Sequence, residues 1–209
     1  MSRPELDSLI VQHLADLDRT TLRIAQLQGE LFEAMKRAVE GWCEENDWRA
    51  YFSYDQGGHW PDEPWLAPLE WRTAGSDDEG DFDAWFQLDV GEKDTQAWVE
   101  GEDFWFITRL CRAGVGQTGF RFKTGLKKGR AWKQAFARIE PLVKKTGFHA
   151  DSRPSLFLPF ALDPVALSRA IEQENLDLAL GPLMDTLREL ARTKAAFTEA
   201  IRLLRPESA

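Results

Sequence analysis

Apolar residues along the first forty positions recur at alternating steps of four and three. The series reads Ile10, Leu14, Leu17, Thr21, Ile24, Gln28, Leu31, Met35, Ala38 and Trp42, and the polar residues Thr21 and Gln28 interrupt it. Residues at this spacing lie on one face of a helix, so the pattern predicts a long N-terminal helix over residues 1–43. Leu22 and Leu27 widen the stripe, which favours packing against the protein's own body. Asp18 can cap a helix start and would divide the run in two.

The same stripe permits a second interpretation, in which it pairs with its counterpart in another copy of the chain. Ile10, Leu17, Ile24 and Leu31 would then form the seam of a dimeric scaffold. Both interpretations stay open at the level of the sequence, and a homodimer is one possible partnership.

Short runs rich in aromatic and β-branched residues follow, and turn residues separate them. The runs are 48–54, 66–73, 83–90, 103–110 and 120–123. In the third run Trp85, Gln87 and Asp89 alternate with apolar residues, which is typical of a strand with one buried face. Short connections between successive strands predict an antiparallel sheet.

Helical patterns return in the second half of the chain. Residues 129–145 form a basic amphipathic stretch, in which Pro141 should kink the predicted helix and Gly147 should end it. An apolar run at 155–161 predicts one more strand, and Asp163-Pro164 is a typical helix start.

We therefore expect a single α+β domain in three parts. The first part is the long helix of residues 1–43. The second, residues 44–161, is an antiparallel sheet of four to six strands with one crossing helix. The third, residues 162–205, is a C-terminal helical pair.

Composition narrows the class of protein. Hydrophobic residues make up 43% of the 209 positions, which is enough for a core, and no run is as long as a membrane span requires. The first residues lack an apolar signal segment, so we expect a cytoplasmic protein that does not enter a membrane. Cys43 and Cys111 lie far apart without a CxxC pair, so we expect free thiols and no zinc or thioredoxin-like site formed by neighbouring residues. Since no ligand or catalytic motif in the chain is complete, we also expect no metal site and no cofactor.

Charge is distributed unevenly along the chain. The net charge is −9, but residues 44–103 carry 18 acids against three bases, a local net charge of −15. Residues 104–150 carry 11 bases against one acid, a local net charge of +10. The two blocks either neutralise each other in the fold or form separate faces for partners. Since the whole chain is acidic, a nucleic-acid partner is disfavoured.

Two motifs match catalytic patterns only in part. Residues 114–119 fit GxGxxG, but the following Phe120-Arg-Phe-Lys predicts a strand where a dinucleotide site needs a helix, so a hairpin loop is favoured. Asp62 and Glu70 echo the carboxylate pair of Mg²⁺-dependent PD-(D/E)XK nucleases. Arg72 stands where those enzymes use lysine, which makes a degenerate nuclease the alternative function rather than the first.

The acidic block is also rich in tryptophan, since seven of the nine tryptophans lie between Trp48 and Trp105. Carboxylates beside exposed indoles are suited to docking a basic protein surface. The residues predicted to contact a partner are Trp60, Trp65, Trp71, Asp77, Asp78, Glu79 and Asp81. We therefore predict a non-enzymatic binding protein, of the regulator, inhibitor or immunity type, without catalytic residues.

Overall fold

The structure is a computed structural model that describes residues 2–53, 63–90, 105–114, 116–126, 129–150 and 155–205. A six-stranded antiparallel sheet forms its centre, with the strand order β1-β2-β3-β4-β6-β5. The strands are β1 (Trp48–Tyr51), β2 (Trp65–Pro68), β3 (Ala84–Val90), β4 (Thr118–Thr124), β5 (His149–Ala150) and β6 (Leu156–Phe160). The predicted α+β class and the antiparallel sheet are confirmed.

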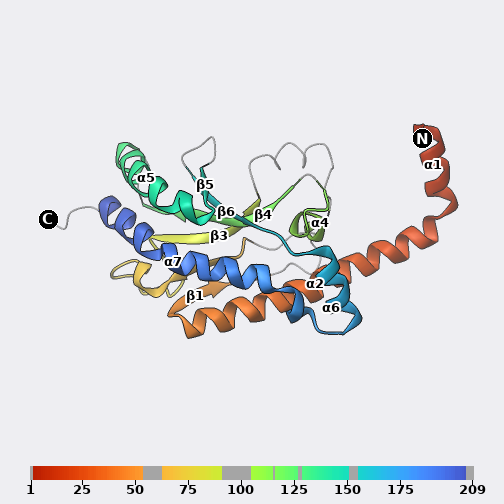
Figure 1. Cartoon of the computed structure of the whole chain (residues 1–209), viewed down its shortest axis with the longest axis horizontal. Helices are drawn as coiled ribbons and strands as arrows, with labels where there is room; N and C mark the ends of the chain where they lie inside the picture. Colours follow the sequence, from red (N-terminus) through yellow and green to blue (C-terminus); the bar gives the residue numbers. More distant parts are fainter. Residues whose placement is uncertain are drawn as a thin grey trace.

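Helices precede, interrupt and follow the sheet in the chain (Figure 1). The α-helices are α1 (Arg3–Gln12), α2 (Leu14–Glu45), α4 (Phe106–Leu110), α5 (Arg130–Val143), α6 (Pro164–Glu172) and α7 (Gly181–Leu204). The short 3₁₀ turns in the described residues are η1 (Leu69–Trp71), η2 (Lys144–Thr146) and η3 (Leu176–Ala179). α7 contacts both α5 and α2, so the C-terminal helix packs against the long N-terminal helix as well as against α5.

Aromatic rings fill the core between the sheet and α7. Phe197 of α7 lies 5.1 Å from Phe86 of β3 and 4.5 Å from Phe122 of β4, measured between ring centroids. Trp71 lies 5.4 Å from Phe86 on the same side. Such ring pairs contribute about 0.5–1.5 kcal/mol each beyond the burial of their area. The strands β3 and β4 are therefore held to α7 by direct ring contact.

The alternation predicted for β3 is confirmed. Ala84, Phe86 and Leu88 are buried, whereas Trp85 and Gln87 are only half-buried. Because successive side chains of a strand point to opposite faces, Trp85 and Gln87 lie on the sheet face turned away from α7.

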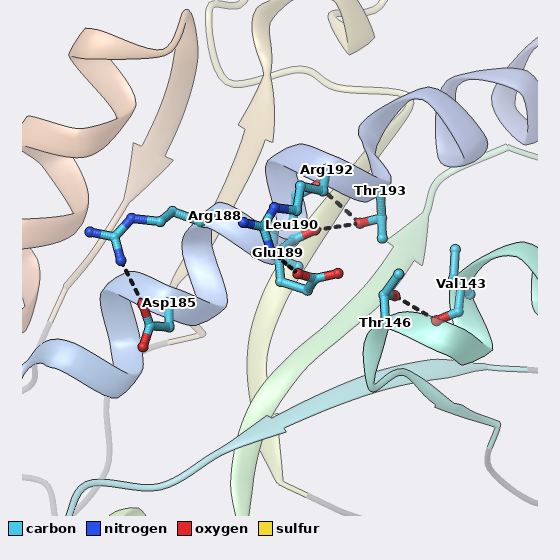
Figure 2. Close-up of polar contacts among 8 residues, drawn as sticks. All are labelled: Val143, Thr146, Asp185, Arg188, Glu189, Leu190, Arg192 and Thr193. Atoms are coloured by element: carbon cyan, nitrogen blue, oxygen red, sulfur yellow. Dashed lines mark hydrogen bonds and ion pairs between the residues drawn. The ribbon is translucent and has the colours of Figure 1, made fainter.

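α7 is amphipathic, and Figure 2 shows the polar contacts of its middle turns. Arg188 pairs with Asp185, and Arg192 pairs with Glu189 at 3.0 Å, each three residues apart on the surface. The hydroxyl of Thr193 donates to main-chain carbonyls within the helix, that of Glu189 among them. These contacts join residues of α7 to each other. The helix is therefore held to the sheet by its buried apolar face, which includes Phe197.

The N-terminal helix is divided, but at His13 rather than at Asp18. The carbonyl of His13 accepts from the amides of both Asp16 and Leu17, at 3.0 and 2.9 Å, so helix α2 restarts there directly. Asp18 lies inside α2, where each amide already has a carbonyl partner one turn earlier and none is left for its carboxylate to cap.

The strand predicted over 103–110 is wrong in its described part, because Phe106–Leu110 forms α4. Its buried residues are Phe106, Arg109 and Leu110, a spacing of three and four that belongs to a helix. Gln28 of α2 fixes the start of α4, since its Oε1 accepts from the amide of Ile107 at 2.9 Å. Within 44–161, the described residues therefore include the helix α4 in addition to the expected crossing helix, α5.

Candidate functional site: an acidic aromatic cleft

A cleft of about 320 Å³ lies over β2 and β3. The side chains that line it are Glu63, Trp65, Asp81, Phe82, Trp85 and Gln87. Two of them are carboxylates and three are aromatic, and no lysine or arginine among the described residues belongs to this lining. The cleft therefore combines apolar walls with negative charge.

Strand pairing brings the two indoles together. Trp65 stands directly opposite Gln87 in the antiparallel pair of β2 and β3. Trp85 lies two residues before Gln87 on the same face of β3, which makes it a diagonal neighbour of Trp65. Both indoles are half-buried and pack against the core, so the cleft walls are held in place by the sheet itself.

An aromatic row extends this surface toward β1. Tyr51 stacks on Trp65 with ring centroids 6.4 Å apart, and its side chain is 46% exposed. On the other side Trp65 contacts Phe82 at 5.3 Å. Phe82 is buried, so the row runs from an exposed phenol to a ring anchored in the core.

Residues 73–81 form a turn beside the cleft, which we call the acidic hairpin. The amide of Thr73 donates to the carbonyl of Asp81 at 3.0 Å and closes it. Within it the carboxylate of Asp78 accepts from the amide of Gly80 at 2.8 Å. Gly75 has a φ of +78°, a left-handed conformation that suits glycine. The hairpin is therefore an ordered turn that displays carboxylates.

The structure brings part of the predicted docking set together. Trp65 and Asp81 line the cleft, and Asp77, Asp78 and Glu79 are exposed on the acidic hairpin next to it. Arg49 of β1 pairs with Glu79 at 3.4 Å. Trp60 lies outside the described residues.

The expectation of a docking role for Trp71 needs correction. Its side chain is 1% exposed, and its indole N–H donates to the hydroxyl of Thr198 in α7 at 2.8 Å. Trp71 is part of the core because it closes the short 3₁₀ turn η1 against α7. A buried side chain of this kind cannot reach a partner surface.

The acidic and basic blocks meet at one place in the described residues. Asp89 of β3 pairs with Arg121 at 2.8 Å and with Lys123 at 3.3 Å, both on β4. Lys123 stands opposite Trp85 in the strand pair, yet its ammonium is engaged by Asp89. Asp89 of the acidic block is therefore neutralised by two bases of the basic block, whereas the carboxylates of the acidic hairpin stay exposed.

Of the two carboxylates predicted for a nuclease-like metal site, Glu70 lies outside the cleft lining and Asp62 is not among the described residues. Glu70 lies on η1, where its carboxylate accepts from the hydroxyl of Thr198 at 2.9 Å and faces Lys194 at 3.6 Å. Asp62 lies outside the described residues. In the part of the chain that the structure describes, no group of three or more His, Cys, Asp or Glu side chains is arranged to hold a metal ion.

The glycine motif takes a different place from the one predicted. Gly119 lies within β4, so a strand does follow the motif, as expected. Gly114 and Gly116 lie between α4 and β4 rather than in a hairpin, because the segment before them is helical.

A second depression, of about 830 Å³, lies between α2 and η3. Its rim carries both signs of charge, since Arg23 and Arg37 line it together with Glu33 and Asp177. Arg37 and Asp177 approach to 3.9 Å across it. This mixed lining favours no single class of ligand, in contrast to the cleft over β2 and β3.

Sequence reasoning missed Trp85, Glu63 and Gln87 as members of the site. The alternation along 83–90 contained the signal for two of them, since it places Trp85 and Gln87 on the less buried face of the sheet. Glu63 gave no comparable signal. It enters the cleft because the chain turns just before β2, where its φ is +37°.

Comparison with known proteins adds no relative. No family model, no curated protein and no solved structure matches the chain. Across the described residues, the helices include none with both the length and the hydropathy needed to cross a membrane.

Proposed function

We propose that this protein acts by binding a basic protein partner through the cleft and the acidic hairpin, which together form the acidic aromatic surface. A regulator, an inhibitor or an immunity-type protein would act in this way, by covering the partner's functional surface. The observation that carries the proposal is the cleft, in which Trp65 and Trp85 lie beside the carboxylates of Glu63 and Asp81 and no described lining residue is basic.

A lysine or arginine side chain of the partner matches this chemistry. Its alkyl stem would lie along the indoles while its charge meets the carboxylates, as long cationic side chains pack on apolar surfaces. A cation over an indole contributes about 0.5–1 kcal/mol at an exposed site and about 2 kcal/mol where water is displaced. The acidic hairpin would chiefly speed the encounter, because exposed charges affect association rates more than final affinity.

The first test uses a lysine- and arginine-rich peptide as the probe and follows tryptophan fluorescence. We expect saturable binding that weakens as salt is added, since screening reduces interactions between exposed charges. A glutamate-rich peptide of equal length should not bind. Equal responses to both peptides would contradict the proposal.

Charge reversal then separates a local effect from a global one. Changing Asp77, Asp78, Glu79 and Asp81 to lysine should abolish peptide binding. A matched control changes four exposed acids elsewhere to lysine, and these are Glu33, Glu172, Asp177 and Asp185. Both variants alter the net charge equally. Loss of binding in both would show that only net charge matters, and would refute a defined docking surface.

Removal of one cleft wall tests the role of the indoles. Trp65→Ala should weaken peptide binding about 5-fold to 30-fold, the equivalent of about 1–2 kcal/mol. Leu69→Ala is the control, because Leu69 is an exposed apolar residue of η1 outside the cleft lining. Unchanged affinity in Trp65→Ala would exclude the cleft as the anchor.

A further inference from the structure

The N-terminal arm, residues 2–26, projects from the body of the protein (Figure 1). Every residue from Ser2 to Arg23 is exposed. Large apolar side chains are among them, with Ile10 at 40%, Leu14 at 51% and Leu17 at 41% exposure. An amphipathic helix without a covered apolar face has little stability of its own, because most helical stability in proteins comes from packing.

The exposed residues continue a stripe that is buried further along. Leu31, Met35 and Trp42 belong to the same alternating series on α2 as Leu14 and Leu17, and they pack into the core with exposures of 2%, 0% and 7%. The stripe on α2 thus has two halves in one register. The second half covers the protein's own body, and the first half has no covering element among the described residues.

The charges of the arm indicate what covers it. Residues 2–26 hold three arginines and four acidic residues. Helices that lie on membranes carry a face rich in lysine and arginine, which this arm lacks. Pairs within the helix, such as Asp16 with Arg19 at 2.6 Å, leave its polar face close to neutral. Two such arms can approach each other with little electrostatic repulsion.

We infer that the arm packs against the arm of a second copy of this chain. The apolar spacing of 3.5 residues is that of helices that wrap around each other, and an identical partner presents the same seam. A two-fold dimer is also the commonest arrangement of soluble assemblies. The interface is centred on Leu17, with Leu14 and Ile24 of the same helix α2 around it. This inference does not depend on the proposed docking surface.

Light scattering coupled to size-exclusion chromatography of the full chain tests the pairing. The expected mass is about twice the 23.9 kDa of one chain. Leu17→Glu should abolish the dimer peak, because it would place two carboxylates in the apolar seam. The substitution should leave the fold intact, since Leu17 contacts solvent in the single chain, and circular dichroism checks this.

Leu22→Glu is the matched control. Leu22 is 64% exposed, more than Leu17, but it lies about 140° around the helix from Leu17 at 3.6 residues per turn. The dimer should therefore survive this change. A monomeric parent chain at every concentration, or equal effects of the two substitutions, would overturn the inference. So would a monomer whose arm instead binds phosphatidylserine vesicles. Peptide binding by the Leu17→Glu monomer would leave the proposed docking function standing.

Discussion

Thr198 connects two distant parts of the chain, and its replacement by valine gives a stability test worked directly from the structure. The hydroxyl accepts from the indole N–H of Trp71 at 2.8 Å and donates to the carboxylate of Glu70 at 2.9 Å. Valine keeps nearly the same shape but removes both interactions. The loss of each hydrogen bond should lower the free energy of unfolding by a different amount.

The indole N–H is the costly loss. Trp71 is 1% exposed, so its N–H would remain buried without an acceptor, which costs about 1–3 kcal/mol. Glu70 is exposed and its carboxylate can turn to water, so its share is small. We therefore expect Thr198→Val to lower the free energy of unfolding by about 1–3 kcal/mol.

Urea denaturation followed by circular dichroism measures this loss. With a slope near 2 kcal/mol per molar urea, the midpoint should fall by about 0.5–1.5 M. Thr193→Val on the same helix is the control, because its hydroxyl donates to carbonyls within α7 that keep their helical partners (Figure 2). The control should change stability by about 0.5 kcal/mol or less. Equal midpoints for the two variants would refute the assignment of Trp71 and Thr198 to a core link.

Two further predictions follow from α2 and from the cysteines. Gly41 lies in α2 with nothing within 4 Å of the position of a Cβ, so Gly41→Ala should raise the free energy of unfolding by about 0.5–1 kcal/mol, measured by urea denaturation; a lower midpoint would contradict this. Burial, followed by the charges of Glu40 and Glu44, raises the pKa of the Cys43 thiol from 9.0 to about 12. A thiol reagent at pH 8 should therefore modify Cys111 first and Cys43 only on unfolding. The folded state holds the thiol proton of Cys43 more tightly than the unfolded state does. The stability that this proton contributes is therefore present below pH 9 and lost as the pH rises toward 12. Rapid modification of both thiols in the folded protein would contradict the burial of Cys43.

The parts of the fold that were predictable from the sequence are those with strong periodicity. The alternation in 83–90 identified β3 and its buried face, and Asp163-Pro164 identified the start of α6, where the Asp163 carboxylate accepts from the amide of Val165 at 2.7 Å. The error at 103–110 arose because a short apolar run does not distinguish strand from helix. There the deciding contact comes from Gln28, which is far away in the chain.

The candidate site was also only partly predictable from local sequence pattern. The sequence indicated an acidic, tryptophan-rich block but not which indoles are exposed. Trp65 and Trp71 are only six residues apart, yet the 3₁₀ turn η1 sends one to the cleft and the other to the core. Strand pairing, which local pattern does not reveal, also brings Trp85 beside Trp65 and lets Asp89 neutralise two bases of β4.

Gly119, the last glycine of the GxGxxG match, is explained by sheet packing rather than by a bound phosphate. It stands opposite Pro159 in the pair of β4 and β6. A Cβ on Gly119 would lie 2.4 Å from the carbonyl oxygen of Leu158 and 2.6 Å from the ring of Phe157. Backbone atoms cannot yield at such distances without moving the strand.

Gly119→Ala should consequently separate β6 from β4 and destabilise the protein by about 3 kcal/mol or more, at the upper end of overpacking effects. Gly125→Ala is the control, because the nearest atom to its Cβ would be Cζ3 of Trp85 at an ordinary 3.9 Å. Its free energy of unfolding in urea denaturation should stay within about 0.5 kcal/mol of the parent value. If Gly119→Ala matched that control, close approach of the two strands would not be the reason for glycine at this position. A local pattern that resembles a nucleotide loop is thus accounted for by a contact between two strands, in which Gly119 lies opposite Pro159, forty residues later in the chain.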